Sequence, residues 1–138
     1  MTQEDKELLL KDLCARLPYG VFCNIGLDYP LSLQRLSVDK LDGVLLDFYK
    51  DGKDYQVYLG EVKPYLFPLS SMTDKQKGEY NKWKHEIPVC RYEYGDVVEE
   101  IELYDSPESF EYLIENHFDY RGLIEKGLAI DATGLNIY

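Results

Sequence analysis

Three cysteines and two histidines are the side chains in this 138-residue chain whose chemistry would suit nucleophilic catalysis or metal binding. Zinc sites use close ligand pairs such as C-x-x-C or H-x-x-x-H, and the sequence has neither spacing. A thiol nucleophile needs a neighbouring base, and only the fold could bring Cys23 or Cys90 to His117 and Asp119. Because no motif requires that arrangement, we assign no catalytic residue, no metal ligand and no cofactor.

Other enzyme signatures are also missing. The glycine-rich phosphate loops G-x-G-x-x-G and G-x-x-x-x-G-K-[ST] do not occur in the sequence. Glycoside hydrolysis needs two carboxylates facing a cleft, and 26 acidic residues leave the choice of any pair arbitrary. We therefore favour a non-enzymatic protein, and a small hydrolase without a recognisable motif stays open as an alternative.

Acidic residues are concentrated in one part of the chain. The net charge is -11, and the segment 93–119 holds ten acidic residues and no Lys or Arg. The pI near 4.5 and the lack of a basic stripe argue against direct nucleic-acid binding. The segment is either a solvated surface or a surface that docks a basic partner or imitates DNA phosphates. Its candidate residues are Glu99, Glu100, Glu102, Glu108, Glu111 and Glu115.

An amphipathic helix is predicted over residues 3–17, with Leu9, Leu13 and Cys14 on its apolar face. Asp12 and Arg16 fall outside that face, and Cys14 is interpreted as a small core residue. Thr2 with Asp5 three positions later is typical of a capping box.

Short strands are predicted next, since apolar and polar residues alternate over 21–25, 33–38, 44–49 and 55–59. The segment Lys50-Asp51-Gly52-Lys53 indicates a tight hairpin between two of them. This spacing favours a small antiparallel meander or an SH3-like barrel.

The second half mixes helices with one more strand pair. A proline-containing connector, 63–73, leads to a helix predicted over 74–86, capped by Thr73 and burying Tyr80, Trp83 and Ile87. Strands at 89–94 and 97–104 flank Gly95. A further helix begins at Ser106-Pro107.

His117 closes the apolar stripe of that last helix, where the helix dipole and the neighbouring acids favour a cationic imidazole. Asp119 is predicted to cap a short final helix over residues 120–126, which Gly127 ends. The last few residues are expected to fray.

These elements predict a single compact α+β domain spanning residues 1–138, with an N-terminal helix and two to three further helices packed on the sheet. No apolar run has the length of a membrane span, and the polar N-terminus is unlike a secretory signal. Three widely spaced cysteines argue against a disulfide framework, so we expect a cytoplasmic protein without a membrane partner.

Three blocks of sequence carry a resemblance: LLLKDLCARLPYGV at the start, VKPYL with PLSSMT in the connector, and HFDYRGLIEKGLA near the end. Together they resemble a family of small uncharacterised proteins from gut Bacteroidales genomes and the phages or mobile elements that infect them. The resemblance implies a cytoplasmic protein of phage or prophage type and supplies no catalytic residues.

The most favoured function is therefore an interaction or accessory protein with a protein partner, and an acidic DNA-mimic inhibitor of a basic nucleic-acid-binding protein is the first alternative. The oligomeric state is left open. Candidate partner-binding residues from the connector and the last block are Lys63, Tyr65, Phe67, Asp119, Tyr120 and Arg121.

Overall fold

The computed structural model describes residues 1–39 and 43–138, and it confirms an α+β protein that begins with a helix. Contacts within the chain divide it into two compact units. Unit 1 comprises Met1–Ser71 and Ile114–Tyr138, and unit 2 comprises Met72–Leu113. The sequence predicts one compact domain over residues 1–138, and the division into two units was not predicted.

Unit 1 is built from one long helix and a mixed sheet. Its elements are α1 (Gln3–Arg16), β1 (Phe22–Asn24), β2 (Leu31–Asp39), β3 (Gly43–Lys50), β4 (Lys53–Tyr58), β5 (Lys63–Pro68), β8 (Phe118–Asp119) and β9 (Ile130–Asp131). Short 3-10 turns lie at Leu17–Tyr19, Leu59–Glu61 and Leu69–Ser71.

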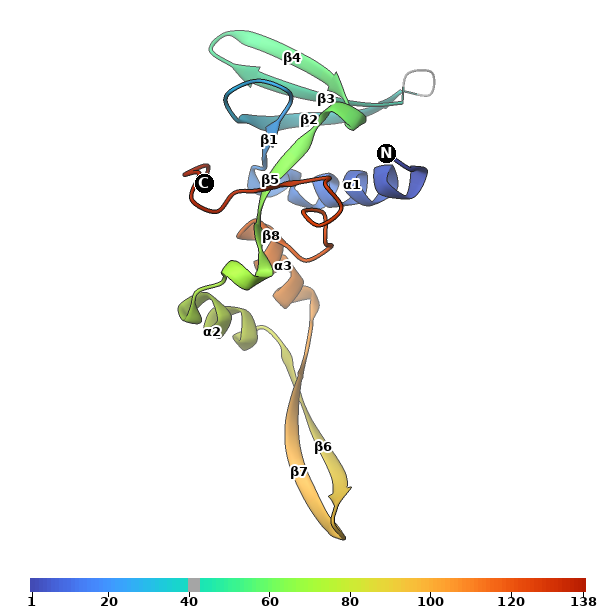
Figure 1. Ribbon diagram of the computed structural model, residues 1–138, viewed down its shortest axis with the longest axis vertical. Coiled ribbons are helices and arrows are strands. Elements are labelled where there is room, and N and C mark those ends of the chain that lie inside the picture. The colour runs from blue at the N-terminus through green and yellow to red at the C-terminus, as the bar shows by residue number, and fades with distance from the viewer. Residues whose placement is uncertain (40–42) are drawn as a thin grey trace. The chain divides into compact units, whose positions relative to one another are not determined.

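The sheet of unit 1 runs in the order β4-β3-β2-β1-β5-β8, with β9 also paired to β5. Strands β1 to β4 are consecutive antiparallel neighbours (Figure 1). Of the two predicted alternatives, a meander and an SH3-like barrel, this arrangement is the meander. Strand β5 pairs with β1 antiparallel and with β8 and β9 in parallel. It therefore joins the N-terminal meander to the C-terminal part of the chain.

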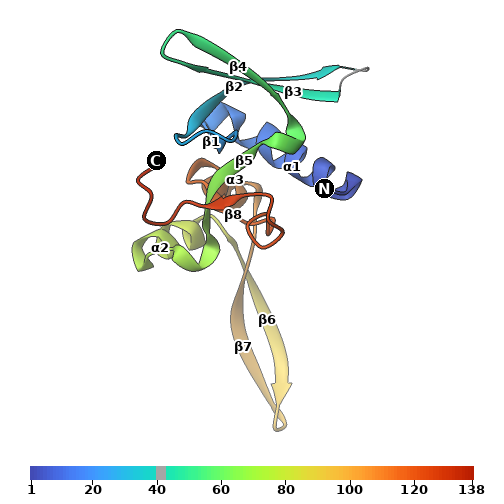
Figure 2. The ribbon, with the colours of Figure 1, turned by 45° about the horizontal axis from the view of Figure 1, so that its top comes forward.

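Helix α1 lies along one face of the meander (Figure 2), and its N-terminus has the predicted capping box. The Asp5 amide donates to the Thr2 hydroxyl at 3.1 Å, and the Thr2 amide donates to the Asp5 carboxylate at 3.3 Å. Leu9 and Leu13 are wholly buried in an apolar core whose other members come from the sheet and the C-terminal segment. These are Val21, Cys23, Leu31, Leu33, Leu46, Phe48, Leu59, Val62, Leu66, Leu123, Leu128 and Ala129.

The buried face of α1 differs from the predicted one. Cys14 is exposed, so its assignment to the core is wrong. Asp12 and Arg16, which the pattern puts outside the apolar face, both have 0% of their surface exposed. The helix therefore turns a charged pair as well as leucines towards the interior.

Unit 2 contains α2 (Asp74–Lys82), β6 (His85–Glu93), β7 (Asp96–Tyr104) and most of α3 (Pro107–Glu115), because the boundary with unit 1 falls after Leu113. Thr73 caps α2 as predicted, with Gln76 completing the capping box. The helix ends at Lys82 because the chain enters β6 at His85.

The predicted extension of this helix to residue 86 is therefore wrong, and so is its buried stripe. Trp83 and Ile87 are exposed.

Strands β6 and β7 form the predicted hairpin, a two-stranded ribbon whose turn is Tyr94-Gly95 (Figure 1). Both turn residues have positive φ angles, 50° and 87°, as a type I′ turn requires. The buried residues of unit 2 are Ser106, Ser109 and Leu113. Isolated two-stranded hairpins are marginally stable in water, and this one has little apolar core of its own to support it.

Candidate functional site

The six predicted partner-binding residues all lie in unit 1, at or near the pairing of β5 with β8. Lys63 is exposed, Tyr65 and Asp119 are buried, and Phe67, Tyr120 and Arg121 are half-buried. The Phe67 amide donates to the His117 carbonyl at 2.8 Å, and the Phe67 ring lies 6.1 Å from that of Phe118. Phe67 therefore connects β5 to the C-terminal segment through both its backbone and its ring.

Asp119 organises the segment that follows β8. Its two carboxylate oxygens accept hydrogen bonds from the amides of Leu123, at 3.0 Å, and Ile124, at 2.9 Å. Residues 123–127 form hydrogen-bonded turns, so the predicted helix over 120–126 is wrong although the capping role of Asp119 is present. The carboxylate is occupied by internal bonds.

A buried ion cluster links α1 to the same segment. The Asp12 carboxylate accepts from Arg16 Nε at 2.8 Å and from Arg121 Nε at 3.2 Å. Arg16 Nη2 also donates to the Phe118 carbonyl at 2.6 Å. Since Asp12 and Arg121 are 109 positions apart, this cluster fixes where the C-terminal block lies on the helix.

His117 lies beyond the end of α3, with φ of 64°, and its ring stacks on that of Tyr138 at 3.5 Å between centroids. Burial, with a smaller effect of the Arg16 charge, lowers the pKa of His117 from 6.5 to about 4. Its buried Nδ1 has no hydrogen-bond partner among the described residues. The expectation of a cationic imidazole is therefore wrong, because the ring is neutral at pH 7.

This geometry predicts a pH-dependent stability. Between pH 6.5 and about 4 the unfolded chain binds a proton at His117 that the folded chain does not. His117 should therefore cost the folded protein about 1–2 kcal/mol as pH falls through that window, after allowing for the partial exposure of its ring. Chemical denaturation at several pH values measures this slope.

The His117→Asn variant is the control, since asparagine tolerates a positive φ and does not titrate in this range. The slope should become shallower in that variant. An unchanged slope would assign the pH dependence to other groups.

Cys23, the buried cysteine of unit 1, is unsuited to nucleophilic catalysis. Burial, followed by the charge of Asp12, raises the pKa of the Cys23 thiol. A nucleophilic cysteine needs the opposite shift. Among residues 1–39 and 43–138, no three His, Cys, Asp or Glu side chains are placed to hold a metal ion.

A surface hollow of about 300 Å³ gathers charged groups on the outer face of the meander. It is lined by Arg35, Asp47, Asp54, Tyr55 and Gln56. Hydrogen bonds from Arg35 Nε at 2.7 Å and Gln56 Nε2 at 2.9 Å lower the pKa of the Asp47 carboxyl. A carboxylate with a lowered pKa is a poor general acid or base near neutral pH.

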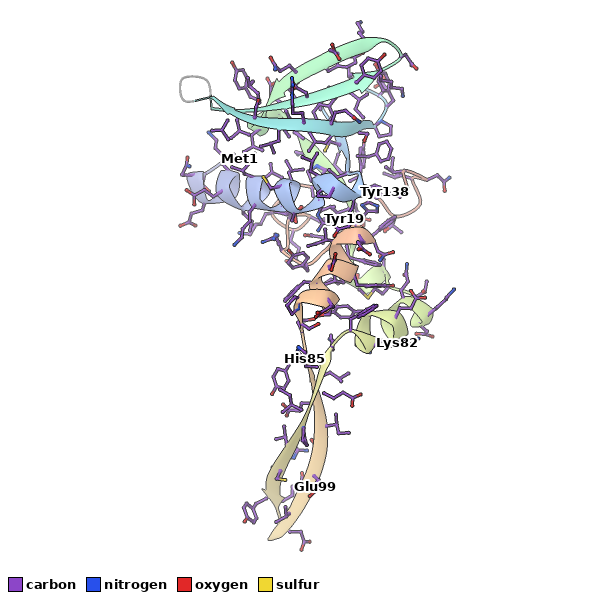
Figure 3. All side chains as sticks on the ribbon, turned by 180° about the vertical axis from the view of Figure 1, so that it is seen from behind. Met1, Tyr19, Lys82, His85, Glu99 and Tyr138 are labelled. Atoms are coloured by element: carbon purple, nitrogen blue, oxygen red, sulfur yellow. The ribbon has the colours of Figure 1, made fainter. Side chains whose placement is uncertain are left out.

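The hairpin of unit 2 has two different faces, because paired residues of β6 and β7 direct their side chains to the same side. The apolar face carries Pro88, Tyr92, Val97, Ile101 and Leu103, together with Glu86, Cys90 and Glu99. Tyr92 is 83% exposed and Ile101 is 67% exposed. Figure 3 shows side chains extending from both faces of the ribbon, between the labelled His85 and Glu99.

The acidic face of the hairpin carries four carboxylates against one guanidinium. The carboxylates are Glu93, Asp96, Glu100 and Glu102, and the cation is Arg91. The same face also carries His85, Ile87, Val89, Val98 and Tyr104. Arg91 forms an ion pair with Glu100, and the Tyr104 hydroxyl donates to Glu102, which raises the pKa of that tyrosine.

The predicted acidic residues thus lie on two elements. Glu99, Glu100 and Glu102 are on β7, and Glu108, Glu111 and Glu115 are exposed on α3.

Polar contacts fasten the base of the hairpin to α2 and α3. The Tyr80 hydroxyl donates to Asp105, and burial, followed by this contact, raises the tyrosine pKa. The Ser106 hydroxyl accepts from the Ser109 amide at 3.0 Å to cap α3, and it also donates to the Trp83 carbonyl. The base is therefore anchored, while the ribbon beyond it has side chains facing solvent on both sides.

Comparisons with protein-family models, with curated proteins and with solved structures each found no match. No helix in the described part of the chain has both the length and the apolar character needed to cross a membrane.

Proposed function

We propose that this chain is a non-enzymatic protein-interaction or accessory protein, and that the β6–β7 hairpin is the surface that docks its partner. The exposure of the apolar face carries the proposal. Contiguous exposed apolar side chains bordered by charges are typical of protein-binding surfaces. Five such side chains occupy one face of a ribbon with almost no buried apolar residue in its unit.

The acidic residues of the hairpin define the partner's charge. Four carboxylates on the acidic face, with Glu86 and Glu99 on the apolar face, favour a basic protein surface. Charge of this kind steers association and depends on salt. The partner is thus a basic protein that also offers apolar side chains.

A DNA mimic remains the second candidate, because Glu108, Glu111 and Glu115 repeat at helical spacing on the exposed side of α3. On the acidic face of the hairpin, however, Ile87, Val89 and Val98 stand between the carboxylates, whereas phosphates would be imitated by an uninterrupted acidic row. This interruption favours an ordinary protein interface. The setting that we propose, the cytoplasm of gut Bacteroidales with their phages or mobile elements, rests on the three sequence blocks alone.

Affinity capture from a gut Bacteroidales lysate, followed by mass spectrometry, tests the proposal. The double variant Tyr92→Ser, Ile101→Ser should lose the partner, and a variant with glutamine at the six predicted acidic positions should hold it only weakly. Val38→Ser is the matched control, because Val38 is 70% exposed on β2 of unit 1. It should retain the partner. Capture of the same protein by all three variants would contradict the proposal.

A further inference from the structure

Strand β7 has an outer edge with unpaired backbone groups. Among the described residues it pairs only with β6, in register from His85↔Tyr104 to Glu93↔Asp96. In a hairpin with a two-residue turn, the pair that flanks the turn is hydrogen-bonded, and the bonding alternates from there. The N–H and C=O groups of Val97, Glu99, Ile101 and Leu103 therefore point away from β6.

The opposite edge of the hairpin is blocked. The same alternation turns the backbone groups of Pro88 outward on β6, and proline has no N–H to offer. Proline and charged residues on an edge are the usual protection against pairing with another strand. Strand β7 contains no proline, and its outward backbone groups belong to three apolar residues and Glu99, so it is the edge that can accept a further strand of opposite charge.

The side chains of β7 define what that strand would look like. Asp96, Glu100 and Glu102 lie on the acidic face together with Val98, whereas Val97, Ile101 and Leu103 lie on the apolar face together with Glu99. A strand added to this edge places its own side chains alternately on the same two faces. Its complement is a strand in which basic and apolar residues alternate.

We propose that the β7 edge binds an extended segment of the partner protein, with alternating basic and apolar residues, by antiparallel strand addition. This inference rests on the proposed function and specifies the binding mode of the same surface. The basic residues lie beside Glu100 and Glu102, and the apolar residues extend the face of Ile101 and Leu103. The main-chain bonds supply affinity, and the alternation supplies specificity.

A second copy of this chain is disfavoured as the occupant. In any antiparallel pairing of two β7 strands, residues of the acidic face meet residues of the same face. Three of the five β7 residues there are carboxylates: Asp96, Glu100 and Glu102. Like charges opposite one another destabilise a sheet, so the charge favours a basic partner over self-association.

The test uses a fluorescent peptide with blocked ends in which four lysines alternate with four valines, called the alternating peptide below. The affinity of this peptide for the protein is measured by fluorescence anisotropy at low salt. In antiparallel addition the valine N–H groups face β7 and the lysine N–H groups face solvent. Methylating the four valine nitrogens should weaken binding at least tenfold, and methylating the four lysine nitrogens should change it less than threefold. A block peptide of the same composition, with all its lysines before all its valines, should also bind at least tenfold more weakly.

Two protein variants test the same edge from the other side. Glu99→Pro removes an outward N–H of β7, whereas Cys90→Pro makes the same change at the residue paired with it on β6. Glu99→Pro should weaken binding of the alternating peptide tenfold, whereas Cys90→Pro should not weaken it. Glu99→Gln removes the charge and keeps the N–H, so it separates the effects of these two losses.

The outcomes distinguish this inference from the proposed function. If both methylated peptides bind as well as the parent peptide, and Tyr92→Ser, Ile101→Ser still loses binding, side chains alone dock the partner. Strand addition is then wrong and the proposed function stands. If the double variant retains both the peptide and the captured partner, the hairpin is not the docking surface and both proposals fall.

Discussion

Replacing Asp12 with alanine should lower the free energy of unfolding by about 3–5 kcal/mol, the usual cost of removing one partner from a buried ion pair. Asp12 and Arg16 are both fully buried, and Asp12 also accepts from Arg121. Without the carboxylate, a guanidinium stays in the interior with no counter-charge. Chemical denaturation monitored by tyrosine fluorescence measures the loss.

The surface pair of Arg35 with the half-buried Asp47 is a matched control, since its Nε to carboxylate distance of 2.7 Å is close to the 2.8 Å of the buried pair. Arg35 is largely exposed, so Asp47→Ala should cost less than about 1 kcal/mol. Similar costs for the two alanine variants would show that burial of the Asp12 cluster adds no stability.

The sequence pattern of α1 predicts its length and its cap but not its buried face. Leu9 and Leu13 mark the core side correctly, yet the stripe drawn through Cys14 turns the helix away from Asp12 and Arg16. Their i, i+4 spacing is a visible signal for an ion pair. Burial of that pair depends on Arg121 and the Phe118 carbonyl, which lie far away in the chain, so no local pattern could indicate it.

In the hairpin, too, the local sequence pattern predicts the elements but not which side chains are buried. Alternation around Gly95 predicts β6 and β7 within a few residues. Alternating apolar residues normally indicate a face covered by another element, whereas Tyr92 and Ile101 are exposed. Alternation of apolar and polar residues indicates that one face of a strand is apolar, and it does not indicate what covers that face. Three of the six predicted acidic residues, Glu99, Glu100 and Glu102, lie on β7, and the apolar face of the hairpin was not predicted.

The residues nominated from the familiar sequence blocks illustrate a third case. Tyr65 and Asp119 are buried, and the Tyr138 hydroxyl donates to the Tyr65 carbonyl at 2.8 Å. The two blocks meet because β5 pairs with β8 and β9. The two blocks thus form a packed joint in unit 1, whereas the surface that we propose to bind a partner lies in the acidic segment of unit 2.

The turn of the hairpin should control that surface. Gly95 has φ of 87°, so Gly95→Ala strains the backbone and should destabilise the ribbon by about 1–2 kcal/mol. Because an isolated hairpin is marginal, this change should open it for much of the time and weaken binding of the alternating peptide about tenfold. Amide hydrogen exchange in β6 and β7 measures the opening directly.

Two further variants fix the interpretation of that result. Gly78→Ala changes a glycine in the middle of α2, where alanine favours the helix, and it should leave exchange in β6 and β7 unchanged. Tyr94→Asn should slow exchange and tighten binding, because Asn-Gly is the preferred pair for a type I′ turn and Tyr94 has φ of 50°. Opposite effects of Gly95→Ala and Tyr94→Asn on both exchange and affinity would mean that a preformed β7 edge is what the partner recognises. If exchange changes and affinity does not, the partner selects side chains rather than an ordered strand, and the hairpin would then fold as it binds.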